Sequence, residues 1–186
     1  MSLLTVKQVQ DWVPQASGEE ALIADAITMA EGLADQACSR TLEAASVTEY
    51  FDVGEYQSSV VLGRYPVVSV TSVVEDASDT SPTTLTSSDY ILDTPSGILR
   101  RDGASWPVGA RSVAVTYTGG YTTATLPAGL RRALLQLVAW VFEDRGNVGA
   151  VNDQTDGHSV TFDEMDGPVP KRIAQALAPW KVRRIG

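Results

Sequence analysis

Residues 67–74 read Val-Val-Ser-Val-Thr-Ser-Val-Val, and six of these eight residues are β-branched. Such a run favours a β-strand, because branched side chains are stiff at χ1 and pack well on a pleated surface. Comparable runs, rich in β-branched and aromatic residues, lie at 47–51, 60–62, 90–92 and 113–117. The turn clusters between them are too short for the crossovers of parallel strands. The sequence therefore predicts an antiparallel β-domain of five or six strands over residues 46–125.

Helical patterns flank this region on both sides. Capping-box spacing at Thr5 and Gln8, and again at Ser17 and Glu20, predicts two N-terminal helices. After the β-region, a long helix that is apolar nearly all round precedes a short C-terminal helix. The prolines that mark these helix starts and stops are Pro14, Pro127, Pro170 and Pro179.

The expected fold class is thus α+β. A helical frame of residues 1–45 plus 126–186 would hold the two N-terminal helices, the long central helix and the C-terminal helix. The antiparallel β-domain, residues 46–125, would be inserted into this frame. Within the frame, residues 146–168 are rich in Gly, Asn and Asp and predict a long loop, and a basic tail follows the last helix.

Composition excludes several classes of protein. The 186-residue chain has one cysteine and a formal net charge of −9. Cys38 alone forms neither an intramolecular disulfide nor a cysteine zinc site. It follows Ala34 at helical spacing, which predicts a small side chain in the core. The acidic balance disfavours a protein that coats nucleic acid with its whole surface. The longest apolar stretch, residues 133–142, is too short to span a bilayer, so no membrane partner is expected.

Catalytic and metal-binding motifs are weak. His158 is the single histidine and has no serine or cysteine motif to serve, so a surface histidine is expected. Residues 152–163 have the ligand spacing of a calcium loop, but Asn, Gln and a short Asp stand at key positions and the match is poor. We therefore expect no enzyme activity, no metal site and no cofactor.

Two helices carry side chains suited to close packing. The alanine-rich face of the long N-terminal helix lets another element approach, either from the same chain or from a neighbouring subunit. The central helix is apolar enough to need several neighbours. The positions predicted to pack between subunits are Ala30, Ala34, Leu134, Val138 and Val141.

Charge is separated along the chain. Residues 1–125 carry six basic and 16 acidic side chains, whereas every charged side chain after Asp166 is basic. The tail could dock on an acidic protein, neutralise DNA phosphates or complement the end of the last helix. Trp180 beside arginines favours protein docking. We expect residues 180–186 to be dispensable for folding, as chain ends commonly are.

The order of these features resembles the head-to-tail connector, or adaptor, proteins of tailed bacteriophages. The resemblance covers most of the chain, and the order of its pieces is more specific than any one of them. The pieces are Leu4-Thr5-Val6-Lys7, residues 38–42 (CSRTL), 62–73 (LGRYPVVSVTSV), 113–121 (VAVTYTGGY) and 126–133 (LPAGLRRA), followed by Glu143-Asp144-Arg145.

The resemblance implies a ring under the portal, typically dodecameric, that helps retain packaged DNA and attach the tail. It implies a location in the virion neck, with synthesis in the bacterial host cytoplasm. The implied partners are the portal protein, further copies of the chain and a tail-side completion or stopper protein, with the channel DNA as a further contact. The implied portal-docking residues are Lys171, Arg172, Trp180, Lys181, Arg183 and Arg184. The loop residues that would face the channel or the next ring are Asp153, Asp156, His158 and Phe162.

Two other classes of function stay open on sequence alone. One is a metal-dependent DNA-processing enzyme that uses the acidic loop. The other is a small-ligand-binding β-domain, which would need a pocket lined by Tyr50, Tyr56, Tyr65 or Tyr117.

Overall fold

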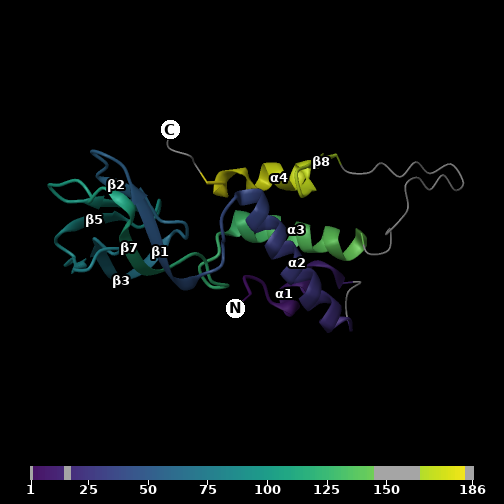
Figure 1. Ribbon diagram of the computed structural model, residues 1–186. Helices are drawn as coiled ribbons and strands as arrows, with labels where there is room; N and C mark the ends of the chain where they lie inside the picture. The colour runs from purple at the N-terminus through teal and green to yellow at the C-terminus, as the bar shows by residue number, and fades with distance from the viewer. Residues whose placement is uncertain (1, 15–17, 145–163, 183–186) are drawn as a thin grey trace, which may run out of the picture. The chain divides into compact units, whose positions relative to one another are not determined.

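The computed structural model describes residues 2–14, 18–144 and 164–182 (Figure 1). The chain divides into two compact units, a β-unit of residues 41–122 and a helical unit that joins residues 2–40 to the segment from 123 onward. The described chain contains α-helices and antiparallel sheets, which confirms the expected α+β class.

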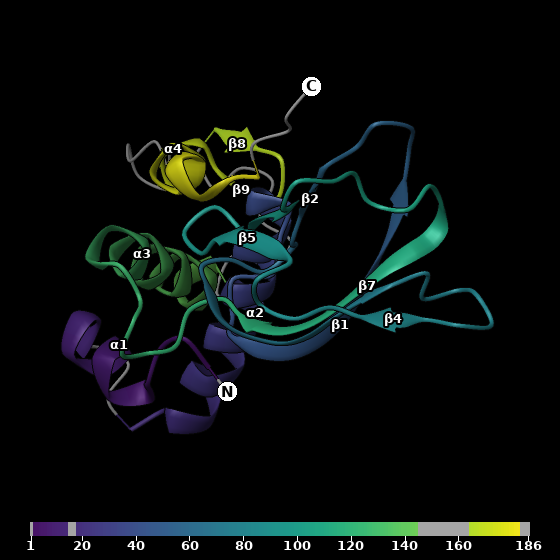
Figure 2. The ribbon, with the colours of Figure 1, turned by 90° about the vertical axis from the view of Figure 1, so that its left-hand side faces the viewer.

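Four α-helices form most of the helical unit: α1 (Val6–Trp12), α2 (Glu20–Cys38), α3 (Ala128–Asp144) and α4 (Lys171–Leu177). Helix α3 packs against the other three, with α4 on one side of it and α1 on the other (Figures 1 and 2). The hairpin of β8 (Met165–Asp166) and β9 (Val169–Pro170) precedes α4, and the short 3₁₀ helix η3 (Ala178–Trp180) follows it. The loop predicted for residues 146–168 is therefore too long at its C-terminal end, because β8 lies inside it.

The helix starts follow local sequence, with one exception. At α1 the expected capping box is present, since Thr5 Oγ1 accepts from Gln8 N–H at 3.3 Å and Gln8 Oε1 accepts from Thr5 N–H at 2.9 Å. At α2 the prediction is wrong: the N-cap is Glu19, without a side-chain cap hydrogen bond. Ser17, the expected cap, lies outside the described residues. The capping-box pattern requires only spacing, so it cannot fix where the first turn begins.

The core of the helical unit is made of aliphatic side chains from all four α-helices. Residues buried to 0% exposure include Ile23, Ala30, Leu134, Leu137, Ile173 and Leu177. The N-terminal segment joins this core through Leu3 and Leu4, exposed by only 1% and 2%. Among the described helices, none combines the length and the hydropathy that crossing a membrane would require.

Two antiparallel sheets form the β-unit. The larger has the strand order β1 (Ala45–Val53), β7 (Gly109–Gly119), β3 (Val67–Glu75) and β4 (Thr83–Thr84), and the smaller has the order β2 (Ser59–Val61), β6 (Ile98–Arg101) and β5 (Tyr90–Asp93). All pairings are antiparallel, as expected. The β-unit has two strands that match none of the five β-rich runs of the sequence. These are β4, which has only two residues, and β6, of which half is arginine.

Both sheets contribute to one core. Val113, Val115 and Tyr117 of β7 share a buried cluster with Val60 of β2 and Leu99 of β6. The alternating burial along β1 follows from this arrangement, because one face of the larger sheet meets the core and the other meets solvent.

The chain crosses itself closely where β7 ends. The N–H of Gly120 donates to Pro66 O at 2.9 Å. A Cβ at Gly119 would lie 2.2 Å from the carbonyl oxygen of Arg64, and one at Gly120 would lie 2.6 Å from that of Glu43. Gly120 also has a φ of 105°, a conformation that favours glycine. The crossing therefore depends on both glycines.

Candidate assembly surfaces

The alanine face of α2 lies inside the chain's own core. Ala30 and Ala34 have 0% exposure, and α2 packs on α3, where Leu134 and Val138 are equally buried. The sequence predicts that these four residues lie between subunits, but the close approach that small side chains permit is used within one chain. Val141, the fifth, is half-buried. A contact between copies stays a prediction for Val141.

The outer face of α2 presents apolar side chains to solvent. Leu22 is 47% exposed and Met29 is 60% exposed. Asp25, Gly32 and Gln36 are exposed on the same face, so that the spacing along the helix alternates between three and four residues. Such spacing forms a continuous stripe along one side of an α-helix. We call these five residues the α2 stripe.

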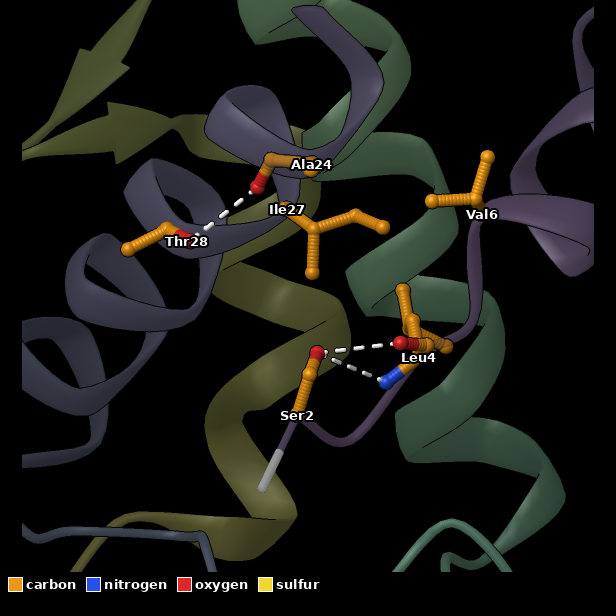
Figure 3. A pocket seen from close by; sticks show the side chains of 6 residues that line it. All are labelled: Ser2, Leu4, Val6, Ala24, Ile27 and Thr28. Carbon is orange, nitrogen blue, oxygen red and sulfur yellow. Dashed lines mark hydrogen bonds between the residues drawn. The ribbon is translucent and has the colours of Figure 1, made fainter. Parts of the chain in front are cut away.

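A shallow groove of about 180 Å³ lies beside this helix, between the N-terminal segment and α2 (Figure 3). Its lining residues are Ser2, Leu4, Val6, Ala24, Ile27 and Thr28. The Thr28 hydroxyl donates to Ala24 O at 3.0 Å, and the Ser2 hydroxyl lies 2.9 Å from Leu4 O and 2.6 Å from Glu31 Oε1. The groove is thus apolar, with its hydroxyls bonded to the protein itself. It has the character of a packing surface.

Glu31 holds the N-terminal segment on α2. Besides the Ser2 hydroxyl, its Oε1 accepts from the N–H groups of Leu3 at 2.8 Å and Leu4 at 3.3 Å. A carboxylate that accepts several donors is strongly fixed in place. The edge of the groove is therefore anchored.

The basic residues predicted for docking fall into two places. Lys171 and Arg172 are exposed on the first turn of α4, and Lys171 Nζ pairs with Glu164 at 2.9 Å. Lys181 is exposed beyond η3, ten residues further along the chain. Arg183 and Arg184 lie outside the described residues. The set is thus divided between the start of α4 and the chain end.

Trp180 is half-buried and packs inside the chain. A Cβ at Gly129, in the first turn of α3, would lie 2.9 Å from Cη2 of the Trp180 indole. Two residues on, the N–H of Val182 donates to Cys38 O at 3.0 Å. The expectation that the segment from residue 180 is dispensable for folding conflicts with these contacts. The bare surface of a helical glycine gives the indole a place to pack, which composition alone does not reveal.

Cys38 is a core residue, as the sequence predicts. It has 0% exposure and a free thiol. Burial raises the pKa of this thiol from 9.0 to about 11, so the neutral form is favoured at neutral pH.

The β-unit contains a polar network that no sequence pattern indicates. Tyr117 Oη donates to Glu49 Oε1 at 2.8 Å and accepts from Arg64 N–H at 2.8 Å, while Glu49 Oε2 accepts from Gly63 N–H at 2.9 Å. Burial raises the pKa of Tyr117 above its ordinary range, and Glu49 adds to the rise, so the phenol stays protonated. The network fastens the segment before β3 to the larger sheet.

Two of the tyrosines of the ligand-binding alternative, Tyr117 and Tyr56, lie in different surroundings. Tyr117 has 0% exposure within the core, whereas Tyr56 is 90% exposed. These two therefore cannot line one pocket.

The residues expected to face the channel lie outside the described part of the chain. They are Asp153, Asp156, His158 and Phe162, and the weak calcium pattern at 152–163 falls there too. Across residues 2–14, 18–144 and 164–182, no group of three or more His, Cys, Asp or Glu side chains is placed to hold a metal ion.

The chain matches a family model over nearly its whole length. A family model described as head completion protein matches residues 2–182. No curated protein matches the chain.

The fold is shared with solved structures, among them three chains of gene transfer agent particles. A chain in the virion of a native gene transfer agent particle is 18% identical with a TM-score of 0.67, covering 98% of this chain and 91% of its own. A chain in the neck of an empty gene transfer agent particle, computed with C6 symmetry, is 16% identical with a TM-score of 0.66, at the same coverage of 98% and 91%. A third, from the native neck computed with C12 symmetry, is 18% identical with a TM-score of 0.58, covering 97% of this chain and 89% of that one.

Proposed function

The chain belongs to the head completion protein family, and from that premise we propose that it is a structural part of the head-to-tail connection of a phage-like particle. The observation that carries the proposal is the extent of the match. Residues 2–182 span both the β-unit and the helical unit, so the role belongs to the whole chain. The resemblance to head-to-tail connectors drawn from the sequence agrees with this family.

We further propose that the protein works as a ring in the neck. Two of the structures that share its fold come from necks computed with C6 and C12 symmetry. A closed ring needs two different surfaces on every copy, because each copy contacts one neighbour on each side. The exposed α2 stripe and the basic start of α4 are two such surfaces.

The partners proposed on either side of the ring are the portal protein and a tail-side completion or stopper protein. Lys181 and the basic residues after it form the proposed portal contact, supported by the exposure of Lys181 and by a chain end without acidic residues. Trp180 is not part of the proposed contact, because its indole packs on Gly129. In this position the ring would help retain the packaged DNA and attach the tail.

Removal of the gene from the phage-like element tests this function. We expect DNA-filled heads that fail to join tails and that lose their DNA on storage, as seen by electron microscopy and by nuclease sensitivity of the genome. A plasmid copy of the wild-type gene should restore tailed particles. Normal numbers of intact, tailed particles without the protein would contradict the connector role.

The portal contact is tested separately with Lys181→Glu. We expect weaker binding to purified portal and unchanged thermal unfolding, since Lys181 is exposed. Lys7→Glu is the matched control, because Lys7 is also exposed and carries the same charge. If the tail instead grips DNA, duplexes of any sequence should bind, with log affinity falling by about 0.9 per phosphate contact for each tenfold rise in salt.

A further inference from the structure

The helical unit separates its charges between two helices. Helix α2 contains Glu20, Asp25, Glu31 and Asp35 and no basic residue. From the start of α4 to Val182, the charged residues are Lys171, Arg172 and Lys181, with no acidic residue among them. One helix is therefore purely acidic and the other purely basic.

The first half of α2 and helix α4 lie beside different helices of the unit. In both views α4 lies on one side of α3, and α1 lies on the other side (Figures 1 and 2). The first half of α2 runs beside α1, which it contacts. Asp25 belongs to this first half of α2, whereas Lys171 is the first residue of α4; elsewhere along its length α2 also contacts α4.

The shapes of the two surfaces suit a helix–helix contact. The α2 stripe offers the apolar side chains of Leu22 and Met29, with the open surface of Gly32 between Met29 and Gln36, where an added Cβ would meet no atom within 4 Å. Along α4 and into the first residue of η3, the exposed positions Lys171, Gln175 and Ala178 follow one another at helical spacing. Ridges of one helix can enter the grooves of another at such stripes.

We propose that the α2 stripe of one copy binds the exposed face of α4 on the next copy. The partner that binds the α2 stripe is a second copy of this chain, because the same molecule carries acidic residues on α2 and basic residues on α4. Pairing of two α2 stripes would bring Asp25 of each copy close to like charges, and pairing of two α4 faces would oppose lysines and arginines. Only the head-to-tail contact joins opposite charges, and a contact of that kind can close into a ring. The inference rests on the ring proposed above.

Mixing two charge-reversal variants tests the contact. Asp25→Lys reverses a charge on the α2 stripe, and Lys171→Glu reverses one on the α4 face while also removing the ion pair with Glu164. We expect each variant alone to self-associate about tenfold or more weakly than wild type, measured by sedimentation velocity over a range of concentrations. An equal mixture should recover association. Where the two variants alternate around a ring, the two substituted side chains, of opposite charge, meet at one contact and the two original residues meet at the next.

Matched controls separate this contact from a general effect of charge. Glu55→Lys and Arg100→Glu make the same charge changes at exposed positions of the β-unit and should leave association unchanged. Thermal unfolding of Asp25→Lys and Lys171→Glu should stay close to wild type, since both side chains are exposed. Should Lys171→Glu be destabilised by repulsion from Glu164, Arg172→Glu in the same exposed face takes its place.

Three results would overturn the proposal. The first is no association of the wild type at any concentration reached, and the second is normal association of both single variants. The third is a mixture that associates no better than its components. The wild-type protein could still be found in the neck by electron microscopy of particles, so these failures are distinguishable from failure of the proposed function.

Discussion

The hydroxyl of Tyr117 ties together residues that are distant in sequence. It bonds to the Glu49 carboxylate and to the Arg64 N–H, each at 2.8 Å, in a side chain without solvent exposure. We expect Tyr117→Phe to lower the free energy of unfolding by about 1–3 kcal/mol, because the half-buried Glu49 carboxylate and Arg64 N–H lose their hydrogen bonds to a fully buried phenol. Urea denaturation measures the change. Tyr56→Phe, at a side chain that is 90% exposed, is the control and should shift stability by less than about 0.5 kcal/mol.

Two helical glycines should respond in opposite ways to alanine. Gly32 has open space where a Cβ would go, so Gly32→Ala should stabilise the chain by about 1 kcal/mol through helix propensity. At Gly129 the same Cβ would lie 2.9 Å from Cη2 of Trp180, and the indole must move. We expect Gly129→Ala to lower stability and to shift tryptophan fluorescence towards that of a more exposed ring. An equal gain in both variants would show that Trp180 is not held there.

Single residues were predictable where the signal is local. The box at Thr5 and Gln8 needs four consecutive residues, and Cys38 sits in a regular helical row. The network of Tyr117 and Glu49 joins positions 68 residues apart, and no spacing rule connects them before the sheet has formed. The place of Trp180 was missed for the same reason, because Gly129 is far away in sequence.

At the scale of elements, residues 180–182 are part of the fold. Trp180 packs on Gly129 and the Val182 N–H bonds to Cys38 O at 3.0 Å. We expect removal of residues 180–186 to lower the free energy of unfolding by about 1–3 kcal/mol, the scale of burying part of an aromatic side chain. Removal of 183–186 alone leaves both contacts intact and is the control in the same thermal scan. Equal stability of the two truncated chains would contradict the packing role.

Strands and helices were predictable from composition to different degrees. The β-branched runs located β1, β2, β3, β5 and β7, whereas β6 was missed because Arg100 and Arg101 follow the buried Leu99 and mask the pattern. The alanines of α2 indicated a close helix contact, and the structure places it against α3. Small side chains permit close approach by any partner, so composition cannot distinguish a contact within the chain from one between chains.

At the scale of the whole molecule, the β-unit carries its own core. Its two sheets share buried side chains that include Trp106, Tyr117 and Leu99, each at 1% exposure or less. We expect the fragment of residues 41–122 to fold alone, because both ends of this span meet at the hydrogen bond from Tyr121 N–H to Leu42 O, 2.8 Å long.

Cooperative urea unfolding of the isolated fragment, together with a β-type circular dichroism spectrum, would support the inserted-domain interpretation. Tyr117→Phe in the fragment should cost about as much as in the full chain, since its partners all lie within residues 41–122. A fragment without a cooperative transition would mean that the sheets form only together with the helical unit.

The crossing at Gly119 and Gly120 bears on how sequences with this fold can drift apart. Most buried positions accept another apolar side chain if volume is kept, so the core can change gradually over evolution. These two positions have no such latitude, because the atom that any substitution adds would lie 2.2 Å or 2.6 Å from a backbone oxygen. Relatives that retain the crossing should therefore keep the glycine pair long after overall identity has fallen to the 16–18% seen among the neck proteins. In distant genomes, this dipeptide between a strand and a helix would be a more durable marker of ancestry than any residue of the hydrophobic core.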